Sequence, residues 1–210
     1  MTRRHRQRRG AATISTAAGA LACLLLAGLP RHWLEAAMWR HMLLQLPLLV
    51  AAGCLLGIAL GTGPSRHGLR RAAIVDQHGI TGLSAALFIT AYWMIPRALE
   101  QSINLPLSEV AKFASLPLAG LLLAASHRRA SPVIQLFFLG NFCWMTAIAG
   151  MQYQNLPQRL CNAYLLDDQL ATGAGLVAAS IAVAAAWCAL HAKALLSNPD
   201  APTPHATTGT

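Results

Sequence analysis

The residues best suited to chemistry are imidazole and thioether groups in the stretch MWRHMLLQLPLLV, residues 38–50. Four side chains of this stretch recur at helical spacing and would share one helix face: Met38, His41, Met42 and Gln45. Soft thioethers together with imidazole suit Cu(I) better than they suit zinc or magnesium. The spacing therefore predicts a Cu(I) site at the point where a long apolar run begins.

The composition indicates that this stretch belongs to an integral membrane protein. The chain of 210 residues is 55% hydrophobic and only 11% charged, and its mean hydropathy is +0.47. A soluble domain would be about a quarter charged. The formal net charge of +9 does not indicate nucleic-acid binding, because the basic residues cluster in short segments between apolar stretches and form no basic face. We therefore expect membrane lipid, and no nucleic acid, around the chain.

Six apolar segments are close to the ~20 residues that a membrane-spanning helix needs. They cover residues 11–29, 41–61, 78–95, 109–126, 132–150 and 169–191. These segments predict an all-α fold, a polytopic bundle of six transmembrane helices. The domain plan is a basic cytoplasmic N-terminus at 1–10, a transmembrane domain over 11–192, and a cytoplasmic tail over 193–210 that should be disordered.

The distribution of basic residues orients these helices in a bacterial inner membrane. With the N-terminus in the cytoplasm, 11 of the 16 lysines and arginines fall on the inner side, as the positive-inside rule requires. The outer side keeps Arg31, Arg40, Arg97, Lys112 and Arg159. An even number of spans then places the C-terminus in the cytoplasm as well.

This orientation gives every methionine after the initiator the same depth, at or near the outer end of a span. Together with the neighbouring histidine and an acid at the start of the last span, these residues form the predicted metal layer: His41, Met42, Met38, Met94, Met145, Met151 and Asp168. Such a layer would bind Cu(I) on the outer face. The alternative is ordinary packing, because methionine commonly fills gaps between apolar side chains.

Other polar residues favour less specific roles. His78, His127 and His191 lie near the inner surface, where histidines usually act as solvated anchors, so we expect no haem site. Asp167 and Asp168 precede the last span and would either cap its helix or hold a cation or a partner protein. The five cysteines form no C-x-x-C pair, and the sequence contains no motif of an ordinary enzyme.

Two glycine-rich stretches predict close helix packing. Gly53, Gly57 and Gly61 stack on one face of the second span, and ATGAG, residues 171–175, opens the last span. Helices approach closely where side chains are absent. We interpret the first row as a packing face within a tight bundle, with a homodimer face as the alternative.

Two stretches resemble the CtaG-type cytochrome c oxidase assembly factors. RHMLLQLPLLVAAG is similar to the histidine-bearing early helix of that family, and LLDDQLATGAGLV is similar to its last-helix motif, in which Asp-Gln precedes a glycine-rich helix start. By residue, His41 matches a family histidine, and Asp168 with Gln169 matches the Asp-Gln pair. The chain departs from the family in its middle helix, where Glu109 and Lys112 stand in place of a histidine-rich segment.

The resemblance implies a membrane accessory or assembly factor for a haem-copper respiratory oxidase, which handles Cu(I) at the outer face and catalyses no reaction. Its partners would be respiratory oxidase subunits. One alternative is a structural membrane subunit or scaffold that binds no metal and packs on a larger complex. The other is a small transporter or a b-type cytochrome.

Overall fold

The computed structural model describes residues 3–62 and 76–196, and over these residues the chain is helical, with turns between the helices and no strand. Six longer helices make up most of it: α1 (Arg3–Gly28), α4 (Leu46–Thr62), α6 (Ile80–Trp93), α8 (Pro106–His127), α9 (Pro132–Asn155) and α10 (Leu166–Leu196). Four short elements join them: α2 (Arg31–Glu35), α3 (Met38–Arg40), the π-helix η1 (His41–Gln45) and α7 (Pro96–Asn104). The predicted all-α class is confirmed for this part of the chain.

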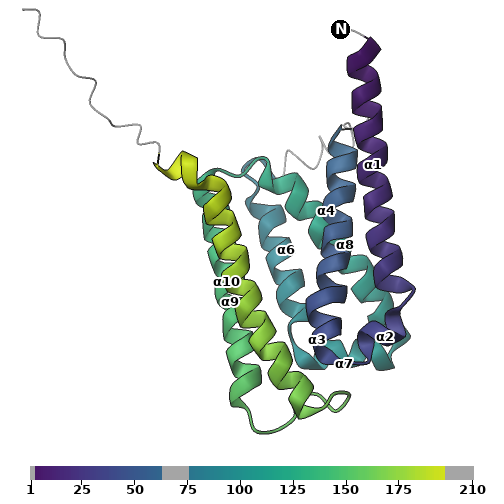
Figure 1. Cartoon of the computed structure of the whole chain (residues 1–210), viewed down its shortest axis with the longest axis vertical. Helices are drawn as coiled ribbons and strands as arrows, with labels where there is room; N and C mark the ends of the chain where they lie inside the picture. Colours follow the sequence, from purple (N-terminus) through teal and green to yellow (C-terminus); the bar gives the residue numbers. More distant parts are fainter. Residues whose placement is uncertain (1–2, 63–75, 197–210) are drawn as a thin grey trace, which may run out of the picture.

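The six longer helices run side by side, and their direction alternates along the chain (Figure 1). One end of the bundle carries α2, α3, α7 and the loop 156–165, and we call it the His41 end. The opposite end, the Asp76 end, carries the start of α1, the turn 128–131 and the end of α10. Within the described residues, segments that the charge pattern assigns to one side of a membrane therefore lie at one end of the molecule.

Four helical segments are long and apolar enough to cross a membrane: Met38–Leu60, Pro106–His127, Pro132–Asn155 and Leu166–His191. A fifth span exists if α6 and α7, which meet at an angle of 74°, are counted as one. The apolar part of α1, Ala12–Gly28, is shorter. The structure thus has the helices of a multi-pass membrane protein with four or five candidate spans, and the count of six stays a prediction.

The third expected span, 78–95, differs most from the prediction, because its helix ends at Trp93 and the chain turns into α7. Pro96 opens α7, and a residue that precedes proline is restricted to extended backbone. Ile95 accordingly has φ −77° and ψ 123°. Tyr153 of α9 donates a hydrogen bond to the carbonyl of Met94 beside this break. As a result α7 lies across the His41 end instead of continuing the span (Figure 1).

The predicted glycine face packs inside the molecule, between α4 and α8. A Cβ added to Gly53 would lie 1.9 Å from the carbonyl oxygen of Pro117, and one added to Gly57 would lie 3.0 Å from the Cβ of Ala124. Backbone-to-backbone approach of this kind needs positions without side chains. The packing interpretation is therefore confirmed for Gly53 and Gly57, while the surroundings of Gly61 lie outside the described residues.

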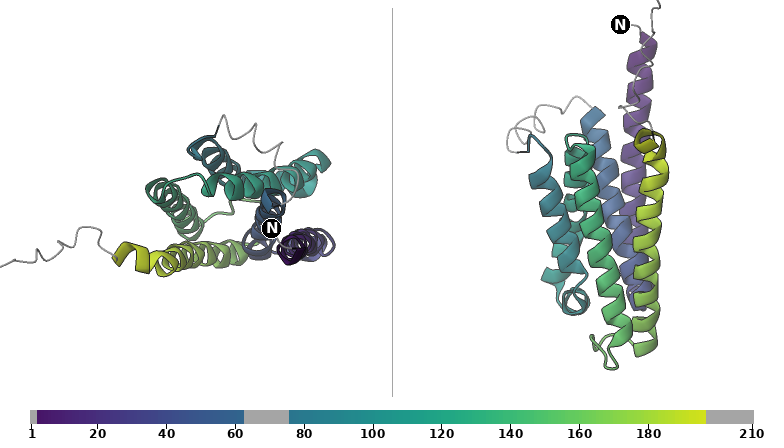
Figure 2. Two further views of the ribbon diagram at one scale, coloured as in Figure 1. Left: turned by 90° about the horizontal axis from the view of Figure 1, so that it is seen from above. Right: turned by 90° about the vertical axis from the view of Figure 1, so that its left-hand side faces the viewer.

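The α9–α10 pair forms one flank of the bundle, opposite α1 (Figures 1 and 2). The two helices approach each other at Gly150 and Gly173, where a Cβ on either would lie 2.6 Å from the carbonyl oxygen of the other. Gly175 faces the Leu43 side chain of η1. The ATGAG stretch thus provides the close packing that its small residues predict, and it helps to join the flank to the rest at the His41 end.

Candidate functional site

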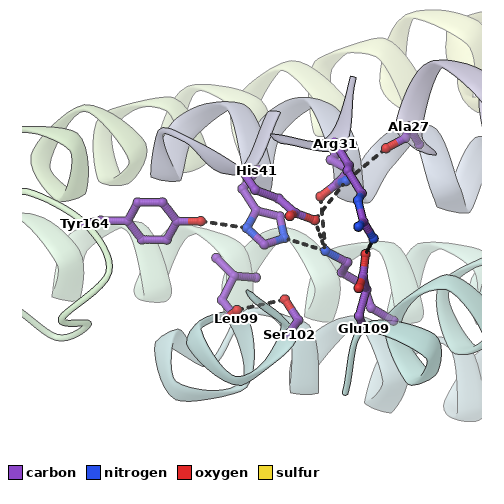
Figure 3. A network of polar contacts seen from close by, with 10 residues as sticks. Ala27, Arg31, His41, Leu99, Ser102, Glu109 and Tyr164 are labelled. Carbon is purple, nitrogen blue, oxygen red and sulfur yellow. Dashed lines mark hydrogen bonds and ion pairs between the residues drawn. The ribbon is translucent and has the colours of Figure 1, made fainter. Parts of the chain in front are cut away.

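A lysine lies buried at the His41 end of α8. Lys112 has no exposed surface, and its Nζ donates to Glu35 Oε1 at 2.6 Å and to Gln45 Oε1 at 3.3 Å. The same nitrogen lies 3.1 Å from His41 Nε2 (Figure 3). A buried ammonium group is stable only where it is paired and its donors are bonded. Glu35 supplies the opposite charge, and the amide and the imidazole complete the coordination of the three N–H donors.

The imidazole of His41 is fully buried and uses both ring nitrogens. Nδ1 lies 2.8 Å from the hydroxyl oxygen of Tyr164, and Nε2 faces the Lys112 ammonium (Figure 3). An ammonium group donates hydrogen bonds and accepts none, so Nε2 must be the acceptor. Nδ1 therefore carries the proton and donates a hydrogen bond to the Tyr164 oxygen. This arrangement fixes His41 as a neutral imidazole in one tautomer.

The π-helix η1 sets the position of His41 and Gln45. Its wide turn closes with a bond from the Leu46 N–H to the His41 carbonyl, directly before Pro47. A proline ring clashes with the carbonyl four residues earlier in a regular α-helix, and widening the turn relieves that clash. Gln45 Nε2 then donates to the carbonyl of Ala27 at 2.9 Å, which satisfies a free acceptor at the end of α1.

The loop 156–165 carries Tyr164 to the histidine. Gln169 of α10 holds this loop, since its Oε1 accepts from the Leu160 N–H at 2.9 Å and its Nε2 donates to the Tyr153 carbonyl at 3.0 Å. Burial raises the pKa of Tyr164, and nearby Cys161 acts in the same direction, so the hydroxyl keeps its proton. The residues Lys112, Glu35, His41, Gln45 and Tyr164 are called the His41 network below.

A second ion pair, between Arg31 and Glu109, lies beside the network and is more exposed (Figure 3). It borders an open groove of about 610 Å³ between the end of α1 and α8, lined by Gly28, Arg31, Glu109, Val110, Phe113 and Ala114. The two ion pairs join the same two elements, because Arg31 and Glu35 are the first and last residues of α2, and Glu109 and Lys112 lie near the start of α8. Together they fasten α2 onto α8.

The residues of the predicted metal layer lie at the His41 end but differ in burial. Met38 and Met42 are buried with His41, and Met94 packs against the same apolar core. The sulfur of Met94 is 3.8 Å from the hydroxyl of Thr146. The remaining three lie on α9 and α10: Met145 and Asp168 are half-buried, and Met151 is 45% exposed.

The metal prediction itself stays open. No group of three or more histidine, cysteine, aspartate or glutamate side chains that could hold a metal ion occurs among residues 3–62 and 76–196. Both nitrogens of His41 are already within hydrogen-bonding distance of other groups. As placed, His41 offers no free lone pair to a metal, so the arrangement fits a polar network better than a resident copper site.

Sequence reasoning missed three members of the network. Lys112 carried a usable signal, because an ionisable residue within a membrane span marks a functional site by default, and it falls within the predicted span 109–126. Glu35 and Tyr164 carried none: each precedes a span in an ordinary loop sequence, and Tyr164 lies 123 residues from its partner His41.

A different polar cluster closes the Asp76 end. Asp76 accepts hydrogen bonds from the Gly82 N–H at 3.2 Å, from the Ser126 hydroxyl and from Arg129 Nη1 at 3.4 Å. These bonds tie the start of α6 to the end of α8. His191 stacks on Trp187 at this end, with ring centroids 4.3 Å apart.

The fold and the site define a class, an all-helical protein with four or five candidate membrane spans and a buried ionic network at one end. Comparison of the chain with protein-family models, with curated proteins and with solved structures finds no match in any of the three. The likeness to the CtaG-type assembly factors therefore rests on the two stretches that carry it, and membership of that family stays a prediction.

Proposed function

We propose that this chain is a membrane accessory protein for the assembly of a haem-copper respiratory oxidase, and that the His41 network is its working site. One observation carries the proposal. The two stretches that resemble the assembly factors are far apart in sequence, yet Gln169 holds the loop from which Tyr164 reaches His41. Residues that match the family at both ends of the chain thus act on one cluster.

The orientation belongs to the same proposal. The His41 end faces the outer side of a bacterial inner membrane, and both termini lie in the cytoplasm, because the two arginine-rich segments that the structure describes, the start of α1 and the turn 128–131, lie at the Asp76 end. Six spans follow if α1 crosses the membrane and if α6 with α7 counts as one crossing. The network would then lie at the depth where an assembly factor meets the outer part of an oxidase subunit.

Cu(I) handling is a second candidate for the same site. The observation that favours it is the placement of Met38 and Met42 in one buried core with His41. Copper on His41 Nε2 would require the Lys112 ammonium to move away, because both would use the same lone pair. We therefore assign no copper step to the network as it stands, and treat copper as cargo whose binding has to be measured.

Complementation in cells tests the proposal. In a strain that lacks this protein, His41→Ala should lower oxidase activity while the variant stays inserted, because it removes the centre of the network. His78→Ala is the matched control, since His78 is an exposed histidine near the Asp76 end and should leave activity unchanged. The copper content of the purified variants separates the two candidates: Met42→Leu should reduce it only if Cu(I) binds.

Two results would contradict the proposed role in oxidase assembly. Normal oxidase activity in the strain without the protein, or with His41→Ala, would remove the assembly function. The purely structural subunit would then be the better description, with its apolar flank packed on a larger complex.

A further inference from the structure

Arg40 ends α3 directly before His41, and its side chain stacks on tryptophan. The guanidinium carbon lies 4.4 Å from the ring centroid of Trp33 and 5.8 Å from that of Trp39. Both indoles are exposed, by 56% and 39%. These distances fall in the range of cation–π contacts, so the two rings hold the guanidinium in place. We call these three residues the Arg40 cluster.

The cluster has no anionic partner in the part of the chain that the structure describes. Glu35 is paired with Lys112, and Glu109 is paired with Arg31. The guanidinium makes no hydrogen bond or ion pair with residues 3–62 and 76–196, and its Nε is buried without a partner. Burying such a donor without an acceptor is costly. Nη1 and Nη2 are not buried and have no partner among these residues either, so the charge and these two groups are available to a ligand, whereas the buried Nε is not.

The donors of the cluster specify the chemistry of that ligand. A guanidinium group and an indole donate hydrogen bonds and accept none, so the cluster suits an anion with several acceptor oxygens. The planar fork of arginine matches phosphate in a bidentate arrangement. A carboxylate would match the fork as well, but the location favours phosphate.

The cluster lies where lipid headgroups would be. Arg40 is in the first turn of the candidate span Met38–Leu60, and tryptophan is enriched at both membrane–water interfaces. We propose that Arg40, with Trp33 and Trp39, binds the phosphate of a phospholipid headgroup at the His41 end of the bundle. The inference rests on the membrane-spanning fold alone and not on a role in oxidase assembly.

Lipid binding to the full chain in detergent tests the proposal. Phosphatidylglycerol is titrated, and bound lipid is counted by native mass spectrometry. Arg40→Gln should weaken the binding by about tenfold, since it removes a charge-assisted hydrogen bond and the stacked cation. Arg97→Gln is the matched control: Arg97 is an exposed arginine of α7 at the same end, and its loss should leave the affinity unchanged.

Further variants keep the test decisive. If Arg40→Gln does not fold, Trp33→Ala and Trp39→Ala keep the charge and should still weaken binding, because the guanidinium is no longer held. Equal affinity of the wild type and all Arg40-cluster variants would overturn the proposal, as would an equal loss in Arg97→Gln. Inorganic phosphate is added in a separate arm. If it displaces the lipid at equal concentration, the ligand is a free anion and the lipid assignment is wrong.

Discussion

Lys112 and Glu35 form an ion pair that is almost completely buried. The Lys112 side chain has no exposed surface, and the Glu35 side chain is 11% exposed. Removing one charge from such a pair leaves the other buried and unpaired, which costs about 3–5 kcal/mol. Glu35→Gln should therefore lower the free energy of unfolding by about this amount, as measured by thermal or denaturant unfolding in detergent. The double variant Lys112→Met with Glu35→Gln should recover most of the loss, because no unpaired charge remains. A double variant whose loss equals the sum of the single losses would contradict the pairing.

Cys161 provides a residue-scale prediction about pH. Burial raises the pKa of this thiol above the value of about 8.5 for a free cysteine. The thiolate is the reactive form, so at any given pH Cys161 holds less of it than a free thiol does. In a variant that keeps only Cys161, the rate of maleimide labelling should reach half its maximum at a higher pH than for a free cysteine. A midpoint at or below the free-thiol value would contradict the buried placement.

Some residues of the His41 network could be predicted from the sequence, and others could not. The methionine neighbours of His41 marked it as a candidate site residue, and it lies at the centre of the network. Lys112 was considered as one charge of the outer side and as a departure from the family pattern, although a lysine within an apolar span was itself a signal of a functional site. Tyr164 could not be found, because its contact with His41 depends on how a ten-residue loop folds, and no local pattern encodes that.

At the scale of elements, the glycines between α4 and α8 determine how closely these two helices pack. A Cβ at Gly57 would already lie 3.0 Å from the Cβ of Ala124, whereas a Cβ at Gly28 would meet the Phe113 ring at an ordinary 3.8 Å. Gly57→Leu should therefore destabilise the bundle by about 1–3 kcal/mol, the usual cost of overpacking, and Gly28→Leu by less. Thermal unfolding of both variants in detergent measures the difference. Equal stability would show that the α4–α8 contact can open without cost.

Hydropathy predicted where helices lie but not how they turn. The apolar content of 78–95 predicted one membrane span, and hydropathy contains no information on the direction that the chain takes. The break follows from Pro96 and the extended backbone of Ile95, which end α6 and turn α7 across the bundle end. Pro47 disturbs its helix in a different way, through the π-helix η1 just before it. Proline positions could thus be read from the sequence, while their geometric outcome required the structure.

At the scale of the whole molecule, polar contacts concentrate at the two ends and apolar surface lies between them. The His41 network joins α2 and α8 to η1, which continues into α4, and links them to the loop before α10. At the other end, the hydrogen bonds of Asp76 join α6 to α8. Exposed apolar side chains such as Phe88, Trp144 and Ile181 lie along the helices between these ends. This distribution matches a lipid-facing surface between two polar interfaces.

The predicted topology of the chain can be measured directly. Introduced cysteines at 62–77 and 127–131 should react only from the cytoplasmic side, and those at 30–40, 96–108 and 151–168 only from outside, because short arginine-rich loops resist translocation. Residues 63–75 lie outside the described part of the chain, so labelling is the direct evidence for them. If α1 does not cross the membrane, the number of crossings changes by one and every later loop changes side. A cytoplasmic label at 151–168 would therefore place the His41 network on the inner face and remove the depth argument for the methionines.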